Sequence, residues 1–158
     1  MEQGLAMNIL IADDSNQKQI IIREFISTEY PSAEITQTYS FSSTINKINS
    51  HEYRILLLDM TMPTYEVEEK SKPDNKMRTL AGKDVITKMA YRKKLIPTII
   101  VTQFDVFGRH NHLSSIKDIA EELIHTYPDI VKGYVLFDLQ SESWKKDLKV
   151  HIEKILND

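Results

Sequence analysis

The chain has 158 residues, which predicts one domain with a sizeable core, and its 41% hydrophobic and 27% charged residues are typical of a soluble globular protein. The net charge of −3 argues against a nucleic-acid surface, and the lack of cysteine excludes disulfides and thiol chemistry. No apolar run is long enough to span a membrane, and no secretory signal precedes the first strand, so we expect a cytoplasmic protein without membrane or nucleic-acid partners.

Short apolar runs alternate with longer segments of helical period along the chain. The predicted strands are Asn8–Ala12, Glu34–Tyr39, Arg54–Leu58, Thr98–Thr102 and Gly133–Phe137. The predicted helices are Ser15–Glu29 with Ser15 as N-cap, a short helix through Phe41 and Ile48, Lys83–Leu95, Ser114–Thr126 and Ser141–Leu156. This (βα)5 pattern predicts an α/β fold with a doubly wound parallel sheet, in a single domain over residues 7–158.

One stretch interrupts this pattern. Residues 64–81 are polar, mixed in charge and without clear period. Structureless loops longer than about 12–15 residues are uncommon in compact domains. Composition favours a mobile insertion, and a lid, a docking loop and a tolerated disordered segment all remain open as its role.

Polar side chains gather at the predicted carboxyl ends of the strands, where open parallel sheets bind their ligands. Asp13 and Asp14 follow the first strand, Asp59 follows the third, and Thr102 ends the fourth. Three neighbouring carboxylates would repel one another, and a hard divalent cation such as Mg²⁺ relieves this repulsion. A carboxylate beside the metal can also act as a nucleophile toward a phosphoryl group. The simpler alternative is that Asp13 and Asp14 cap a helix and Asp59 merely follows a strand.

Four pieces of the sequence carry a family resemblance: ILIADDS near the start, LLLDMTMP in the middle, Gly82 before the third helix, and PTIIVTQ at the fourth strand. In this order and spacing they resemble the receiver domain of two-component response regulators, over essentially the whole chain. The resemblance implies a flavodoxin-like sheet with strand order 2-1-3-4-5.

The resemblance also implies roles for individual residues. Asp59 would be the phosphoacceptor, and Asp13, Asp14, Asp59 and the backbone carbonyl of Thr61 would hold Mg²⁺. Thr102 would move its hydroxyl toward the phosphoryl group. Tyr134 would be the aromatic switch on the fifth strand.

The fifth strand departs from the family pattern. Receiver domains resembling this one carry a lysine three residues after the switch aromatic, and here that position is Phe137. No lysine or arginine lies between Lys132 and Lys145, so a small shift of register does not restore the cation. We therefore expect the Mg²⁺ site to survive while the coupling of phosphorylation to a switch is weakened.

Three functions fit this sequence to different degrees. The first is a stand-alone receiver that takes a phosphoryl group from a sensor histidine kinase or phosphotransfer protein. It would pass its state to a downstream protein or a homodimer, and would be no enzyme beyond self-phosphorylation and autodephosphorylation. The second is a receiver-like interaction module that works without phosphorylation. The third, a phosphatase of the haloacid-dehalogenase type, has less support because such enzymes carry Asp-x-Asp where Thr61 follows Asp59 by two positions.

Overall fold

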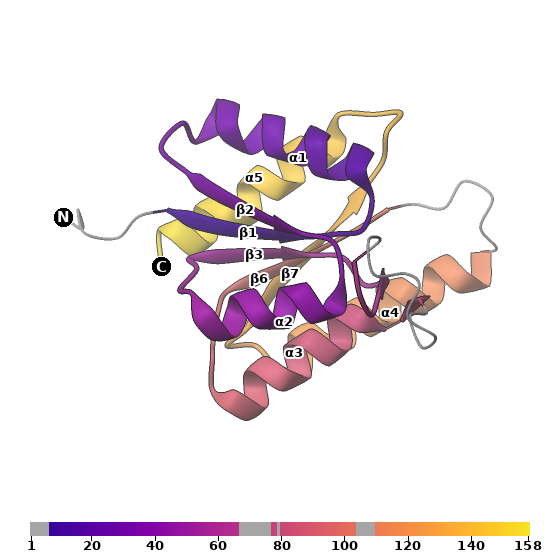
Figure 1. Ribbon diagram of the computed structural model, residues 1–158. Coiled ribbons are helices and arrows are strands. Elements are labelled where there is room, and N and C mark those ends of the chain that lie inside the picture. Colours follow the sequence, from indigo (N-terminus) through magenta and orange to yellow (C-terminus); the bar gives the residue numbers. More distant parts are fainter. Residues whose placement is uncertain (1–6, 67–76, 79, 104–109) are drawn as a thin grey trace.

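A five-stranded parallel sheet forms the centre of the molecule (Figure 1). The computed structural model describes residues 7–66, 77–78, 80–103 and 110–158. The strands are β1 (Asn8–Ala12), β2 (Glu34–Thr38), β3 (Ile55–Leu58), β6 (Thr98–Gln103) and β7 (Val131–Phe137). Their order in the sheet is β2-β1-β3-β6-β7, and every neighbouring pair is parallel. This is the flavodoxin-like order predicted from the sequence, with β6 and β7 as the fourth and fifth strands.

Helices cover both faces of the sheet (Figure 1). On one face lie α1 (Asn16–Glu29) and α5 (Ser143–Leu156), and on the other lie α2 (Phe41–Ser50), α3 (Ala81–Arg92) and α4 (His110–Thr126). Each face has its own cluster of buried apolar side chains, because alternate residues of a strand point to opposite sides of the sheet. The central strands are apolar on both faces for this reason, and β3 is buried at all four of its residues.

Most element boundaries lie within two or three residues of the prediction. Ser15 caps α1 as expected, since its Oγ accepts a hydrogen bond from the backbone N–H of Lys18. Helix α4 begins at His110, four residues earlier than predicted. Helix α3 ends at Arg92 instead of Leu95, because Lys93 adopts a left-handed conformation with φ of 57° and so terminates the helix.

Parts of the insertion predicted over residues 64–81 form regular structure. A short antiparallel pair joins β4 (Met62–Pro63) to β5 (Met77–Arg78), and α3 already begins at Ala81. The carboxylate of Glu66 accepts a hydrogen bond from Ser43 at the start of α2, so the first residues of the insertion also pack on the domain. Residues 67–76 and 79 lie outside the described part of the chain, as do residues 104–109.

No helix within the described ranges is both long and apolar enough to cross a membrane.

Candidate metal and phosphoryl site

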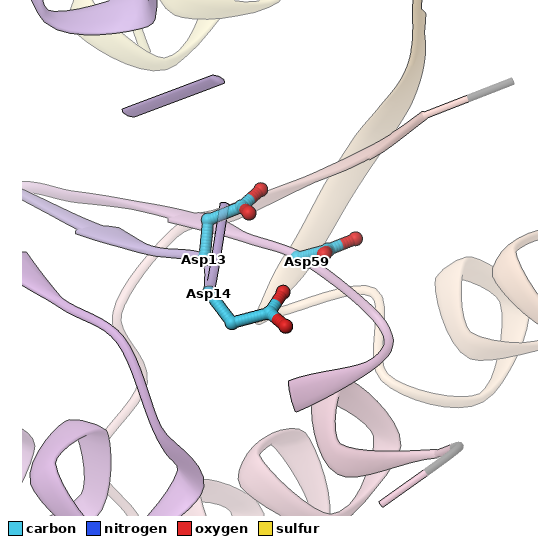
Figure 2. A group of neighbouring side chains, drawn as sticks. All are labelled: Asp13, Asp14 and Asp59. Carbon is cyan, nitrogen blue, oxygen red and sulfur yellow. The ribbon is translucent and has the colours of Figure 1, made fainter. Parts of the chain in front are cut away.

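Three carboxylates meet at the carboxyl ends of β1 and β3 (Figure 2). Oxygen atoms of Asp13, Asp14 and Asp59 all lie within 4.8 Å of one another. The two strand ends are fixed to each other, because the backbone N–H of Asp59 donates to the carbonyl of Ala12 at 2.9 Å. The structure thus brings together the three acidic residues that the sequence placed at one edge of the sheet.

The surroundings of these carboxylates favour a cation. Burial raises the pKa of the Asp59 carboxyl to about 7; the Lys18 ammonium opposes this rise, and the nearby Asp13 and Asp14 add to it. The pKa of Asp14 is also raised, first by burial and then by repulsion from Asp13. The raised pKa values of Asp14 and Asp59 show that their negative charges are poorly compensated, and a site of hard oxygen donors fits Mg²⁺, which would supply further positive charge.

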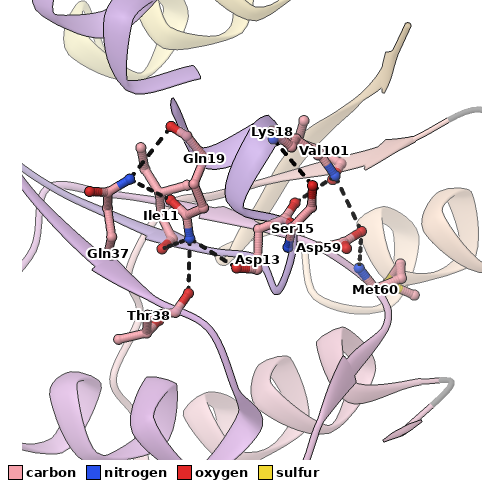
Figure 3. A network of polar contacts seen from close by, with 10 residues as sticks. All are labelled: Ile11, Asp13, Ser15, Lys18, Gln19, Gln37, Thr38, Asp59, Met60 and Val101. Atoms are coloured by element: carbon pink, nitrogen blue, oxygen red, sulfur yellow. Dashed lines mark hydrogen bonds and ion pairs between the residues drawn. The ribbon is translucent and has the colours of Figure 1, made fainter. Parts of the chain in front are cut away.

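A buried lysine from α1 completes the cluster (Figure 3). The Nζ atom of Lys18 lies 2.6 Å from Asp13 Oδ2 and 3.5 Å from Asp59 Oδ1, and it donates to the carbonyl of Val101 at 2.8 Å. The side chain is only 2% exposed. Sequence reasoning missed this residue because it sought a cation only on the fifth strand. The signal was present, since Lys18 precedes Ile22 and Ile26 at four-residue spacing on the buried stripe of α1.

A buried amide holds the start of α1 against the strand ends (Figure 3). Gln19 Nε2 donates to the carbonyls of Ile11, Asp13 and Thr38 at 2.9 to 3.1 Å, and Gln19 Oε1 accepts from Gln37 at 2.9 Å. Because Gln19 is next to Lys18 and fully buried, this network fixes the helix turn that delivers the ammonium.

The remaining predicted site residues lie around this cluster. Thr102 is buried near the end of β6, and Thr61 is half-buried between β3 and β4. The register pairs Thr102 with Leu136 and Ile100 with Tyr134, so Thr102 and Tyr134 face the same side of the sheet. The Tyr134 hydroxyl donates to Glu121 of α4 at 3.4 Å. The roles of these residues stay predictions.

Gly82 has a specific reason to be glycine. Its backbone N–H donates to the carbonyl of Met60 at 3.0 Å. A Cβ atom here would lie 2.8 Å from the carbonyl oxygen of Asp59 and 2.9 Å from Met60 Sδ. The start of α3 therefore lies directly against the backbone that carries the Asp59 carboxylate.

We expect Gly82→Ala to lower the free energy of unfolding by about 1–3 kcal/mol, as overpacking does in a tight core. The displaced backbone should also weaken Mg²⁺ binding. Urea unfolding and Mg²⁺ titration measure the two effects. Ala90→Gly, in the same helix but away from Asp59, is the control, and it should leave the Mg²⁺ affinity unchanged. Wild-type Mg²⁺ affinity in Gly82→Ala would contradict the proposed link.

Comparison with curated proteins decides the family. The chain is 62% identical over 143 residues to the Detocs response regulatory protein DtcB of Enterobacter cloacae, covering 90% of this chain and 95% of that protein. This chain belongs to the receiver-type response regulators. It is also 25% identical over 143 residues to the uncharacterized protein y4jR of Sinorhizobium fredii, again covering 90% and 95%. No family model matches the sequence.

Solved structures agree with this receiver domain in fold. A CheY-like response regulator receiver domain protein from Methanospirillum hungatei matches 97% of this chain and 95% of its own, with a TM-score of 0.61 and 16% identity. The response regulator TrrA of Thermotoga maritima, solved in complex with Mg²⁺ and BeF, matches 91% of this chain and 97% of its own, with a TM-score of 0.57 and 17% identity.

Proposed function

We propose that this receiver domain is a Mg²⁺-dependent phosphoryl acceptor that takes the phosphoryl group on Asp59. The observation that carries the proposal is the convergence of Asp13, Asp14 and Asp59 at the ends of two adjacent strands, with one ammonium ion beside them. Structural neighbours support it, because TrrA was solved with Mg²⁺ and BeF.

Each residue of the site would have a separate role in the phosphoryl transfer. An oxygen of the Asp59 carboxylate attacks phosphorus, the bond from phosphorus to the donor breaks, and the donor leaves with the electron pair. Asp13, Asp14, Asp59 and the carbonyl of Thr61 would hold Mg²⁺, which neutralises charge on the transferring group. Asp59 is suited to the attack because it is held in place by the backbone N–H of Met60, which donates to its Oδ1 at 2.9 Å.

The output of the domain would be protein contact. Thr102 ends β6 beside the site, and Tyr134 lies on the same face of the sheet, bonded to Glu121 of α4. A phosphoryl group that draws the Thr102 hydroxyl toward it would alter the packing between β7 and α4. We place the partner surface on α4, β7 and α5. The donor would be a sensor histidine kinase or phosphotransfer protein in a system of the kind in which the Detocs relative is the response regulatory protein.

Intact mass spectrometry tests the proposal. The wild-type protein and Asp59→Asn are incubated with Mg²⁺ and acetyl phosphate, and we expect a single phosphoryl adduct on the wild type alone. Asp118→Asn, which removes an exposed carboxyl group from α4, is the matched control and should be modified like the wild type. The adduct should disappear from all samples when EDTA removes the metal.

A receiver-like module that works without phosphorylation is the second candidate, favoured by Phe137 at the position of the family's lysine. No adduct on the wild type, together with no Mg²⁺ binding in a calorimetric titration, would reject the first proposal in favour of this one.

A further inference from the structure

The fifth strand presents an aromatic ring where a cation would be expected, and a cation from another element lies over it. Phe137 is fully buried at the end of β7. The Nζ atom of Lys18 lies 5.7 Å from the centre of its ring, within the range of a cation–π interaction. The same Nζ is 3.5 Å from the Asp59 carboxylate. The site therefore has an ammonium ion, and Phe137 helps to support it.

The charge of the cluster shows what this ammonium can do. Among the residues that the structure describes, three ionised carboxylates and one ammonium at this site carry two net negative charges, which one Mg²⁺ balances. Phosphorylation replaces the single negative charge of Asp59 by a phosphoryl group with two. The added charge then lies in a site where Lys18 is the ammonium in ion-pair contact with two of the carboxylates. An unpaired buried charge is costly, and this lysine is already desolvated and fixed in position.

We propose, on the basis of the proposed function, that Lys18 of α1 is the cation that binds the phosphoryl group on Asp59. It takes the role that the strand-five position, occupied here by Phe137, leaves vacant. The ammonium keeps its proton throughout. As the new bond between Asp59 oxygen and phosphorus forms and acetate or another donor group leaves with its electron pair, Lys18 exchanges its contact with the carboxylate for one with a phosphoryl oxygen.

Two properties distinguish this role from simple support of the fold. Before phosphorylation, Lys18 and Mg²⁺ compete for the same carboxylates, so removing the ammonium should strengthen Mg²⁺ binding. After phosphorylation, Lys18 and Mg²⁺ both bind the phosphoryl oxygens, so removing the ammonium should weaken the binding of the phosphoryl group in the site. A residue that only packed α1 would change both affinities in the same direction when lost.

The single tryptophan provides a reporter of this contact. The Trp144 ring lies 4.8 Å from the ring of Phe137, and Trp144 is 2% exposed. Lys18, Phe137 and Trp144 thus form a continuous series of contacts from the site to α5. Movement of the ammonium toward a phosphoryl group should change the fluorescence of Trp144.

The test uses Lys18→Met with Mg²⁺ alone and with beryllofluoride, which imitates an aspartyl phosphate, at saturating Mg²⁺. We expect Mg²⁺ affinity to rise roughly 3- to 10-fold, because a positive charge close to the metal site is lost. Beryllofluoride affinity should fall about 10- to 150-fold, the range for loss of a hydrogen bond to a charged group. The beryllofluoride-induced change in Trp144 fluorescence should also disappear. Lys145→Met is the matched control, because its ammonium lies 5.8 Å from the Trp144 ring but on the outer side of α5.

The outcomes separate this inference from the function on which it rests. If the wild type binds no beryllofluoride and forms no phosphoryl adduct, both proposals fall. If the wild type responds and Lys18→Met binds beryllofluoride within twofold of it, or loses affinity for both ligands equally, the inference alone is wrong. Lys18→Arg, which keeps the cation, should retain more beryllofluoride affinity than Lys18→Met. If Lys18→Met fails to fold, Lys18→Gln, which also removes the positive charge, is judged by the same criteria.

Discussion

Replacing Asp59 by asparagine is expected to stabilise the metal-free protein, by an amount that grows as the pH rises from about 4 to about 7. Burial raises the pKa of the Asp59 carboxyl to about 7, whereas an unfolded chain would ionise it near 4. Between these values the folded state holds a proton that the unfolded state has lost, so stability falls as the pH rises from about 4 to about 7 and levels off above 7. Asparagine removes this dependence, and its Oδ1 can still accept the hydrogen bond from Met60.

The size of the effect follows from the shift. A change from about 4 to about 7 corresponds to at most ~4 kcal/mol, and solvent at a side chain that is 14% exposed reduces this to about 2 kcal/mol. For a domain of this length we expect a rise in Tm of roughly 4–8 °C at pH 8 and little change at pH 4.

Thermal unfolding in EDTA at the two pH values measures this difference. Asp118→Asn, which removes an exposed carboxyl group, should not show it. Adding Mg²⁺ should stabilise the wild type more than Asp59→Asn, because the wild type keeps all three carboxylates. A less stable Asp59→Asn at pH 8 in EDTA would show that burial does not make the ionised Asp59 carboxylate costly as inferred.

The sheet could be predicted from the sequence because its strands are short apolar runs that fit no other secondary structure. Asn8–Ala12 was placed to the residue, and Ser15 was identified as a cap because its hydroxyl precedes a helical stripe. The pair formed by β4 and β5 could not be predicted, since each strand is only two residues long and carries no period. Such pairs depend on how the flanking elements bring the chain together.

The acidic site was predictable once the strands were identified, because the carboxyl ends of parallel strands lie at one edge of the sheet. Its cation was not, because a lysine on a helix is ordinarily solvated and its sequence position says little about where a long side chain ends. Lys18 lies far from Phe137 in sequence, and only the fold brings its long side chain from α1 over the Phe137 ring. The lysine of the family position is absent from the fifth strand, where Phe137 stands, and the ammonium that Lys18 brings from α1 was not anticipated from the sequence.

This arrangement changes what a lysine at the family position would do. From the sequence alone, Phe137→Lys would restore a missing cation. In the structure it would place a second ammonium beside Lys18 and remove a ring that packs on Trp144. We expect the single variant to lose at least about 3 kcal/mol of stability, from lost aromatic packing and from repulsion between like charges.

Combining Phe137→Lys with Lys18→Met should relieve part of that loss, because one ammonium then serves the carboxylates from the strand and methionine fills the space on α1. The two changes should be coupled by about 2 kcal/mol in a double-mutant cycle measured by urea unfolding with Mg²⁺ present. A parallel cycle with Lys149→Met, whose ammonium pairs with Glu29 at the end of α1, should be additive within about 0.5 kcal/mol. The double variant should also bind beryllofluoride more tightly than Lys18→Met does. Additivity in the first cycle would mean that Lys18 and Phe137 act independently. The ammonium of Lys18 on α1 would then not replace a lysine ammonium at the β7 position.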